Sequence, residues 1–287
     1  MTRVWYRLLW LPLALVLPGC TKFDVLNATV PPLGYCRTSG LAYGESPRQK
    51  LDVYEPSQKL DRAAPVVVFF YGGSWQFGER RNYRFVGQAL ADHGIVAVLP
   101  DYRLYPEVTF PGFVEDGAKA VRWTHDNIAR FGGDPSRVFL MGHSAGAHIA
   151  TLLALDEHYL KDVGRSREIV RGVIGLSGPY DFTPGEESRV VFRMSRGDKA
   201  DPAIEPIHFA AAAAQGPPLL LIHGGRDSVI GQDNTVKFAR AVQDAGGDAR
   251  AVVYSKLDHA GVCLALASPF HWLAPVFRDV LEFVEQH

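Results

Sequence analysis

The chain has 287 residues, of which 47% are hydrophobic and 21% are charged, so it is long enough for one large globular domain with a full core. Its 30 Lys and Arg residues are balanced by 31 Asp and Glu residues, which gives a formal net charge of -1 at pH 7. A mixed, nearly neutral chain lacks the basic patches of nucleic-acid-binding proteins, so we expect no nucleic-acid partner.

Residues 1–19 predict a signal peptide. Arg3 and Arg7 precede an apolar run over 8–17, which is too short to span a bilayer but suits a secretion signal. The following Leu17-Pro-Gly-Cys20 resembles the bacterial lipoprotein box, in which the cysteine is lipidated and becomes the first residue. This resemblance implies export across the inner membrane and a lipid anchor at Cys20 that holds the protein in the cell envelope, facing the periplasm. The alternative is a plain secretion signal with an incidental cysteine.

Residues 20–45 predict a lipidated tether, because they contain Pro31-Pro32 and several glycines and show little apolar periodicity. The catalytic domain is expected over 46–287. Two cysteines remain after Cys20, and we expect Cys36 and Cys263 to be buried free thiols, with a disulfide between them as the open alternative.

Apolar runs that suit strands alternate with helical patterns along the rest of the chain. This alternation predicts an α/β fold: a doubly wound, mostly parallel sheet with helices on both faces and a site at the carboxyl ends of the strands. The expected strands are 49–55, 64–71, 95–99, 138–141, 169–176, 217–223 and 249–254, and the expected helices are 83–93, 113–129, 145–155, 232–245 and 271–286.

The segment Gly142-His-Ser-Ala-Gly146 lies between a predicted strand and an Ala-rich apolar helix. A serine on such a strand-turn-helix elbow is lifted clear of the sheet, and glycines on either side of it avoid collisions with the neighbouring strand and helix. Ser144 is therefore the candidate nucleophile.

The order of motifs from about residue 50 onward resembles the α/β-hydrolase superfamily, in its esterase branch of hormone-sensitive-lipase-like enzymes, feruloyl-esterase-like proteins and kynurenine formamidases. The resemblance rests on Tyr71-Gly-Gly-Ser-Trp75, the serine motif, His223-Gly-Gly-Arg-Asp227 and the late Asp258-His259. It implies the α/β-hydrolase fold and a serine hydrolase without a metal or other cofactor.

A serine hydroxyl needs a base and a carboxylate that orients the base. Asp227 and His259 follow Ser144 where the superfamily has its acid and its base. Asp233 and Asp258 are competing acids, but a helix start and the position before the base are more typical of a cap or a surface residue. His223 and His271 are expected to be structural, while His143 and His148 are candidates for the pocket lining.

By the same resemblance, Gly72, Gly73 and Ala145 are expected to supply the backbone amides of an oxyanion hole. Tyr71 replaces the family's histidine, and we expect its side chain mainly to order this loop. Asp101, Arg103 and Asp116 are expected to connect loops through charge-assisted hydrogen bonds.

The sequence therefore predicts a carboxylesterase that cleaves a small-molecule ester through an acyl-enzyme. Two alternatives stay open: hydrolysis of an arylformamide or other small amide by the same residues, and a non-catalytic surface-binding lipoprotein on a hydrolase scaffold. The acyl and alcohol groups are not readable, because loops around Trp75, Pro179-Tyr180 and 183–210 form the pocket walls.

Overall fold

The computed structural model describes residues 22–58, 60–182, 189–194 and 201–287. The expected signal peptide and Cys20 lie outside these residues, as does part of the 183–210 loop region. None of the helices in the described ranges is both long enough and apolar enough to cross a bilayer.

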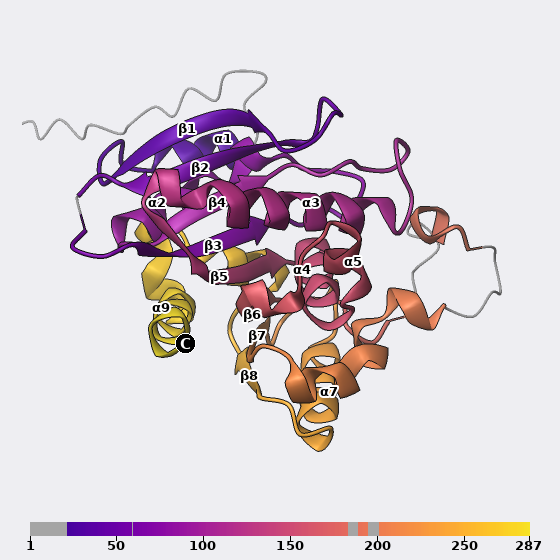
Figure 1. Cartoon of the computed structure of the whole chain (residues 1–287). Coiled ribbons are helices and arrows are strands. Elements are labelled where there is room, and N and C mark those ends of the chain that lie inside the picture. Colours follow the sequence, from indigo (N-terminus) through magenta and orange to yellow (C-terminus); the bar gives the residue numbers. More distant parts are fainter. Residues whose placement is uncertain (1–21, 59, 183–188, 195–200) are drawn as a thin grey trace, which may run out of the picture.

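One eight-stranded sheet organises the molecule (Figure 1). Antiparallel pairing is confined to β1 with β2 and β2 with β4, and all other neighbours run parallel. The predicted α/β fold with a mostly parallel sheet is confirmed. In spatial order the strands are β1 (Tyr35–Ala42), β2 (Lys50–Pro56), β4 (Val96–Pro100), β3 (Ala64–Phe70), β5 (Gly133–His143), β6 (Val170–Leu176), β7 (Leu219–Gly224) and β8 (Ala249–Tyr254).

Helices cover both faces of the sheet. Phe139 of β5 packs against Phe283 of α9 (Val276–Gln286), with ring centroids 6.2 Å apart. Phe70 of β3 pairs with Gly142, three residues further along β5, and lies against Gly117 of α3 (Gly112–Asn127). Because side chains alternate between faces along a strand, α9 and α3 lie on opposite faces.

The remaining helices pack against these two layers or lie in the connections between strands. Helix α2 meets α9 where His93 contacts Phe277, and α4 packs on α3 where Ile149 contacts Gly117. The α-helices not yet bounded are α1 (Lys22–Ala28), α2 (Arg84–Asp92), α4 (Ala145–Leu155), α5 (His158–Asp162), α7 (Asp233–Asp244) and α8 (His259–Leu264). The short 3-10 helices are η1 (Arg80–Tyr83), η2 (Ile128–Phe131), η3 (Arg167–Ile169), η4 (Val190–Phe192), η5 (Pro202–Ile204), η6 (Pro206–Gln215) and η7 (Ser268–Leu273).

The structure corrects three expectations. The tether over 20–45 is wrong in both halves, because Lys22–Ala28 forms helix α1, whose Phe23 packs on Tyr83, and Tyr35–Ala42 forms the edge strand β1 of the sheet. Cys36 is an exposed thiol on this strand rather than a buried one, whereas Cys263 is buried, and both are free. The helix expected over 271–286 is divided by Pro275, so that α9 begins at Val276.

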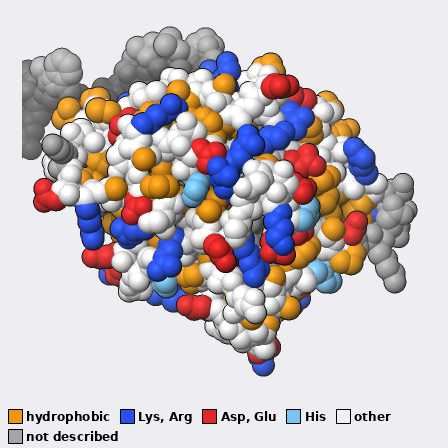
Figure 2. All heavy atoms as spheres, in the orientation of Figure 1, with side chains coloured by type: hydrophobic (Ala, Val, Ile, Leu, Met, Phe, Trp, Pro, Cys, Tyr) orange, Lys and Arg blue, Asp and Glu red, His pale blue; other side chains and the backbone are white. Residues whose placement is uncertain are grey.

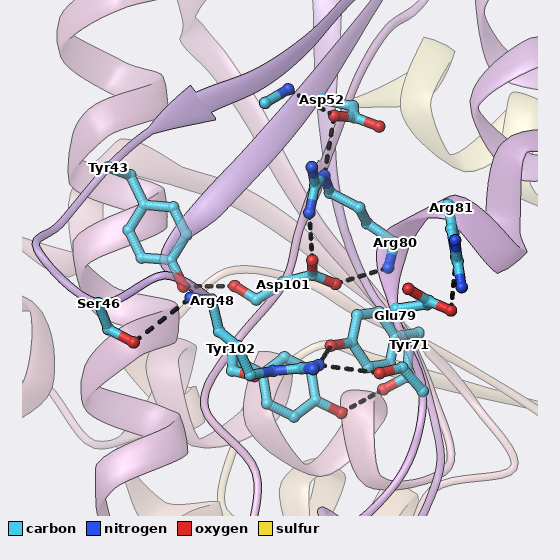
Figure 3. A network of polar contacts seen from close by, with 12 residues as sticks. Tyr43, Ser46, Arg48, Asp52, Tyr71, Glu79, Arg80, Arg81, Asp101 and Tyr102 are labelled. Atoms are coloured by element: carbon cyan, nitrogen blue, oxygen red, sulfur yellow. Dashed lines mark hydrogen bonds and ion pairs between the residues drawn. The ribbon is translucent and has the colours of Figure 1, made fainter. Parts of the chain in front are cut away.

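Arginines connect the loops beside the sheet to buried carboxylates (Figure 3). Arg80 donates through Nε to Asp52 at 2.8 Å, and it binds Asp101 through both its amide and its guanidinium. Arg103 forms a bidentate pair with Asp116, at 2.8 and 2.7 Å. The predicted charge-assisted links between loops are therefore confirmed. On the face drawn in Figure 2, acidic and basic side chains are interspersed.

A neutral histidine, His148, lies in the hydrophobic core. His148 on α4 has no solvent exposure, and its Nε2 donates to the carbonyl oxygen of Ile204 at 2.7 Å. Its ring contacts Trp75, Phe182 and Phe192, which offer no charge to stabilise a second proton. Burial therefore lowers the pKa of His148 to about 4.

We predict that this histidine makes folding sensitive to mild acid. Between the pKa of about 4 in the folded chain and about 6.5 in the unfolded chain, only the unfolded state gains the proton, so stability falls as pH falls. From pH 7 to pH 4.5 the wild type should lose about 2 kcal/mol more unfolding free energy than His148→Gln, which retains a donor for Ile204. Urea unfolding at both pH values measures the difference, and equal losses in the two proteins would contradict the prediction.

Candidate active site

Ser144 occupies a strained turn between β5 and α4. Its φ of 53° and ψ of -122° are unusual for a residue with a side chain, and its amide donates to the carbonyl oxygen of Leu176 on β6 at 2.8 Å. A Cβ atom on Gly142 would lie 2.2 Å from the carbonyl oxygen of Gly146, and one on Gly146 would lie 2.0 Å from that of Phe70. Only glycine fits at both positions, so the elbow expected around Ser144 is present.

Asp227 and His259 are 32 residues apart in the chain, but their side chains are in contact in the fold. The Nδ1 atom of His259 lies 2.7 Å from Oδ2 of Asp227, whose side chain is fully buried, while the imidazole is 16% exposed. A carboxylate accepts a hydrogen bond, so Nδ1 carries the proton and Nε2 is left with a free lone pair. This is the tautomer that a general base requires.

Local donors hold Asp227 as a carboxylate. Its Oδ1 accepts hydrogen bonds from the amides of Val229 and Ile230, each at 2.9 Å. Burial acts against its charge, but the amides and the His259 imidazole outweigh burial and hold the pKa of Asp227 below its usual value. The acid therefore stays ionised at neutral pH.

Two further histidines position this pair, and the sequence indicated neither contact. His223, at the end of β7, is buried with Nε2 3.2 Å from Oδ2 of Asp227, and Thr235 and the carbonyl of Ile230 hold its ring. His143, which precedes Ser144, donates through Nε2 to the carbonyl oxygen of His259 at 2.9 Å. Burial, with a smaller contribution from His259, lowers the pKa of His143 to about 3, so this ring is neutral.

Gly72 and Gly73 lie over the nucleophile. A Cβ on Gly72 would lie 3.0 Å from the Cβ of Ser144, which places this loop directly beside the serine. Gly73 has a φ of 132°, and a Cβ there would lie 2.2 Å from the carbonyl oxygen of Phe77. Ala145 begins α4, so its amide is one of the unpaired N–H groups of the first helical turn.

The Tyr83 phenol lies near the backbone of this loop. Burial raises its pKa, and the Gly72 backbone has a smaller effect in the opposite direction.

A single arginine supports this loop from behind (Figure 3). Arg48 donates to the Tyr71 hydroxyl and to the carbonyl oxygen of Gly78, both at 2.8 Å, and to that of Tyr102 at 2.9 Å. The Tyr102 hydroxyl donates in turn to the carbonyl oxygen of Tyr71 at 2.7 Å. The Tyr71 ring is buried between Tyr102 and Tyr83, and its hydroxyl points into this network, where Arg48 binds it.

The competing residues have other roles. The carboxylate of Asp258 caps α8 by accepting from the amide of Gly261 at 2.7 Å, and Asp233 is the first residue of α7. His271 bonds to the carbonyl of Leu266, and His148 lies in the aromatic cluster with Trp75. In the described part of the chain no group of three His, Cys, Asp or Glu side chains has the spacing of a metal site.

Comparison with known proteins gives a consistent picture. The BD-FAE family model matches residues 51–242. The isoprenylcysteine α-carbonyl methylesterase ICME of Arabidopsis thaliana is 33% identical over 78% of this chain and 56% of its own length. Esterase LipC of Mycobacterium tuberculosis is 29% identical over 73% of this chain and 56% of its own length. The chain thus spans little more than half the length of these relatives.

Among solved structures, esterase B of Lactobacillus rhamnosis superposes with a TM-score of 0.75 at 22% identity, over 92% of this chain and 89% of that chain. At this identity the superposition shows a common α/β-hydrolase fold. The family match covers more than half of the sequence, and its range includes Ser144 and Asp227. The chain belongs to the BD-FAE family.

Proposed function

We propose that this protein hydrolyses carboxylic esters, with Ser144 as nucleophile, His259 as general base and Asp227 as the acid that orients the base. The observation that carries the proposal is the 2.7 Å hydrogen bond between Asp227 and the Nδ1 atom of His259, together with the strained elbow that presents Ser144. The names of the relatives, a methylesterase and an esterase, support an ester as the substrate.

In the first half of the reaction the Oγ atom of Ser144 attacks the ester carbonyl carbon while Nε2 of His259 takes the hydroxyl proton. The ionised Asp227 stabilises the imidazolium that forms. Negative charge develops on the carbonyl oxygen, which accepts hydrogen bonds from the backbone amides of the oxyanion hole, those of Gly72, Gly73 and Ala145. The intermediate collapses to an acyl-serine, and His259 returns the proton to the departing alcohol oxygen.

Water completes the cycle. His259 deprotonates a water molecule that attacks the acyl-serine carbonyl, the same amides stabilise the second oxyanion, and the proton passes to the Oγ atom of Ser144 as the carboxylic acid leaves. Each half of the reaction needs the same neutral Nε2, which the hydrogen bond from Nδ1 to Asp227 provides.

Removal of the nucleophile should abolish turnover without unfolding the chain. We expect Ser144→Ala to lower kcat on an activated ester by about a thousandfold or more and to abolish labelling by a fluorophosphonate probe. Ser136→Ala is a matched control, because that hydroxyl bonds to Asp134 at the opposite end of β5. Ser144→Ala activity close to that of the wild type, in a protein with native circular dichroism, would refute the assignment.

The loop that carries Gly73 should tolerate loss of a hydroxyl but not a displaced amide. Tyr71→Phe removes one of three acceptors of Arg48 and should change kcat by only a few fold. Gly73→Val should cost about 3 kcal/mol of transition-state stabilisation, because its Cβ would collide with Phe77 and shift the amide. Both variants are assayed on one activated ester. A loss of hundreds of fold in folded Tyr71→Phe would make the phenol itself an oxyanion donor.

We further propose that Cys20 is lipidated and that the mature protein is anchored in the cell envelope, facing the periplasm. The support is the sequence: a short apolar signal segment after Arg3 and Arg7, followed by Leu17-Pro-Gly-Cys20. More than one acyl chain is needed for a stable anchor, and lipoprotein processing supplies this.

The anchor has a direct test in cell fractionation. The wild type should sediment with membranes and incorporate labelled palmitate, whereas Cys20→Ala should do neither. Cys36→Ala serves as a control for an exposed cysteine outside the signal. Recovery of the wild type entirely in the soluble periplasmic fraction would refute lipidation.

A further inference from the structure

An apolar groove of about 430 Å³ opens beside the proposed catalytic histidine. One wall comes from α1, which contributes Phe23 and Leu26, and the facing wall comes from α8, which contributes Cys263 and Leu264. The volume falls within the range of small-molecule sites, roughly 300–1,000 Å³. Most of its surface is hydrocarbon, as expected for a site that binds a hydrocarbon chain.

The groove is lined by residues that are adjacent in the chain to the reacting groups. Ala260, the residue after His259, lines it, and so does His143, the residue before Ser144. His143 is bonded to the backbone of His259, so the end of the groove is fixed relative to the base. Tyr83, which also lines the groove, stacks on Tyr71 of the loop beside the serine, with ring centroids 5.6 Å apart.

The side of the scissile bond follows from proton transfer. When the tetrahedral intermediate collapses, Nε2 of His259 must donate to the oxygen of the leaving alcohol, so this oxygen lies next to the imidazole. A chain attached to that oxygen therefore starts on the histidine side of Ser144. Ala260, which follows His259 in the chain, lines the groove, and this contact favours the histidine side for it.

We infer that this groove binds an apolar chain in the alcohol part of the ester, and that α1 supplies part of the substrate-binding wall. The inference rests on the proposed esterase function. The natural substrate is then an ester of a hydrophobic alcohol rather than of a sugar or a charged alcohol, because a polar group placed there would lose its hydrogen bonds to water without replacement.

The chemistry of the lining agrees with this assignment. None of the described residues that line the groove is an acid, a lysine or an arginine. Burial raises the pKa of the Cys263 thiol to about 12, and burial with the neighbouring His259 lowers that of His143 to about 3. Both side chains are therefore uncharged at neutral pH and present no site for an ionic group.

The experiment varies the alcohol while the acyl group stays acetyl. With the full chain, kcat/KM for methyl, butyl and octyl acetate, each below its micelle concentration, should rise by about tenfold or more from methyl to octyl. Leu26→Trp and Leu264→Trp fill the groove from its two walls, and each should reduce the octyl-to-methyl ratio to near one. Leu33→Trp is the matched control, because Leu33 is 77% exposed and does not line the groove.

A second series separates the two parts of the ester. For p-nitrophenyl acetate, butyrate and octanoate, the dependence of kcat/KM on acyl length should be the same in the wild type and in both tryptophan variants. If the variants change this acyl series instead of the alcohol series, the groove binds the acyl chain and the inference is overturned.

The result also distinguishes this inference from the proposed function. A wild type that hydrolyses none of these esters would refute the esterase itself. A wild type that hydrolyses them with the same octyl-to-methyl ratio as both variants would remain an esterase, but α1 and α8 would have no part in its specificity. Two variants on separate walls keep the test decisive if one of them fails to fold.

Discussion

The close approach of three backbone segments at the carboxyl edge of the sheet is the constraint on which the site depends. The start of α4 lies so near the ends of β3 and β5 that Gly142 and Gly146 have no room for a Cβ. This approach forces Ser144 into its strained conformation and brings Gly72 within contact distance of the serine side chain. The nucleophile is thus placed by the close packing of backbone segments.

Ion pairs and hydrogen bonds from arginines fix the loops that lie outside the hydrophobic core. Arg48 donates hydrogen bonds to the carbonyl oxygens of Gly78 and Tyr102, which belong to two different loops. In the same region Arg80 forms ion pairs with both Asp52 and Asp101 (Figure 3). Such pairs cost desolvation when they form, but an unmatched charge left behind by removal of one partner costs more. Their value here is geometric, because they restrict where the strand ends and the oxyanion loop can lie.

Sequence reasoning succeeded where one local pattern determines the structure. Continuous apolar runs predicted the central strands, and the glycine spacing around Ser144 predicted the elbow. It failed for β1, whose half-exposed edge position leaves no apolar alternation to detect. It also missed the contact of His223 with Asp227 and that of His143 with the His259 backbone, because both depend on how distant segments meet in space.

Local contacts position the acid of the site, whereas a contact between distant parts of the chain positions the base. Asp227 takes its direction from amides two and three residues further along its own turn, whereas His259 is the first residue of a six-residue helix that docks onto His143, 116 residues away. Short elements of this kind open locally at a lower free energy than the core unfolds. Mild heat or a low denaturant concentration should therefore abolish esterase activity while the far-UV circular dichroism spectrum is still that of the native sheet. We therefore expect loss of activity to report the undocking of α8 before it reports unfolding of the sheet.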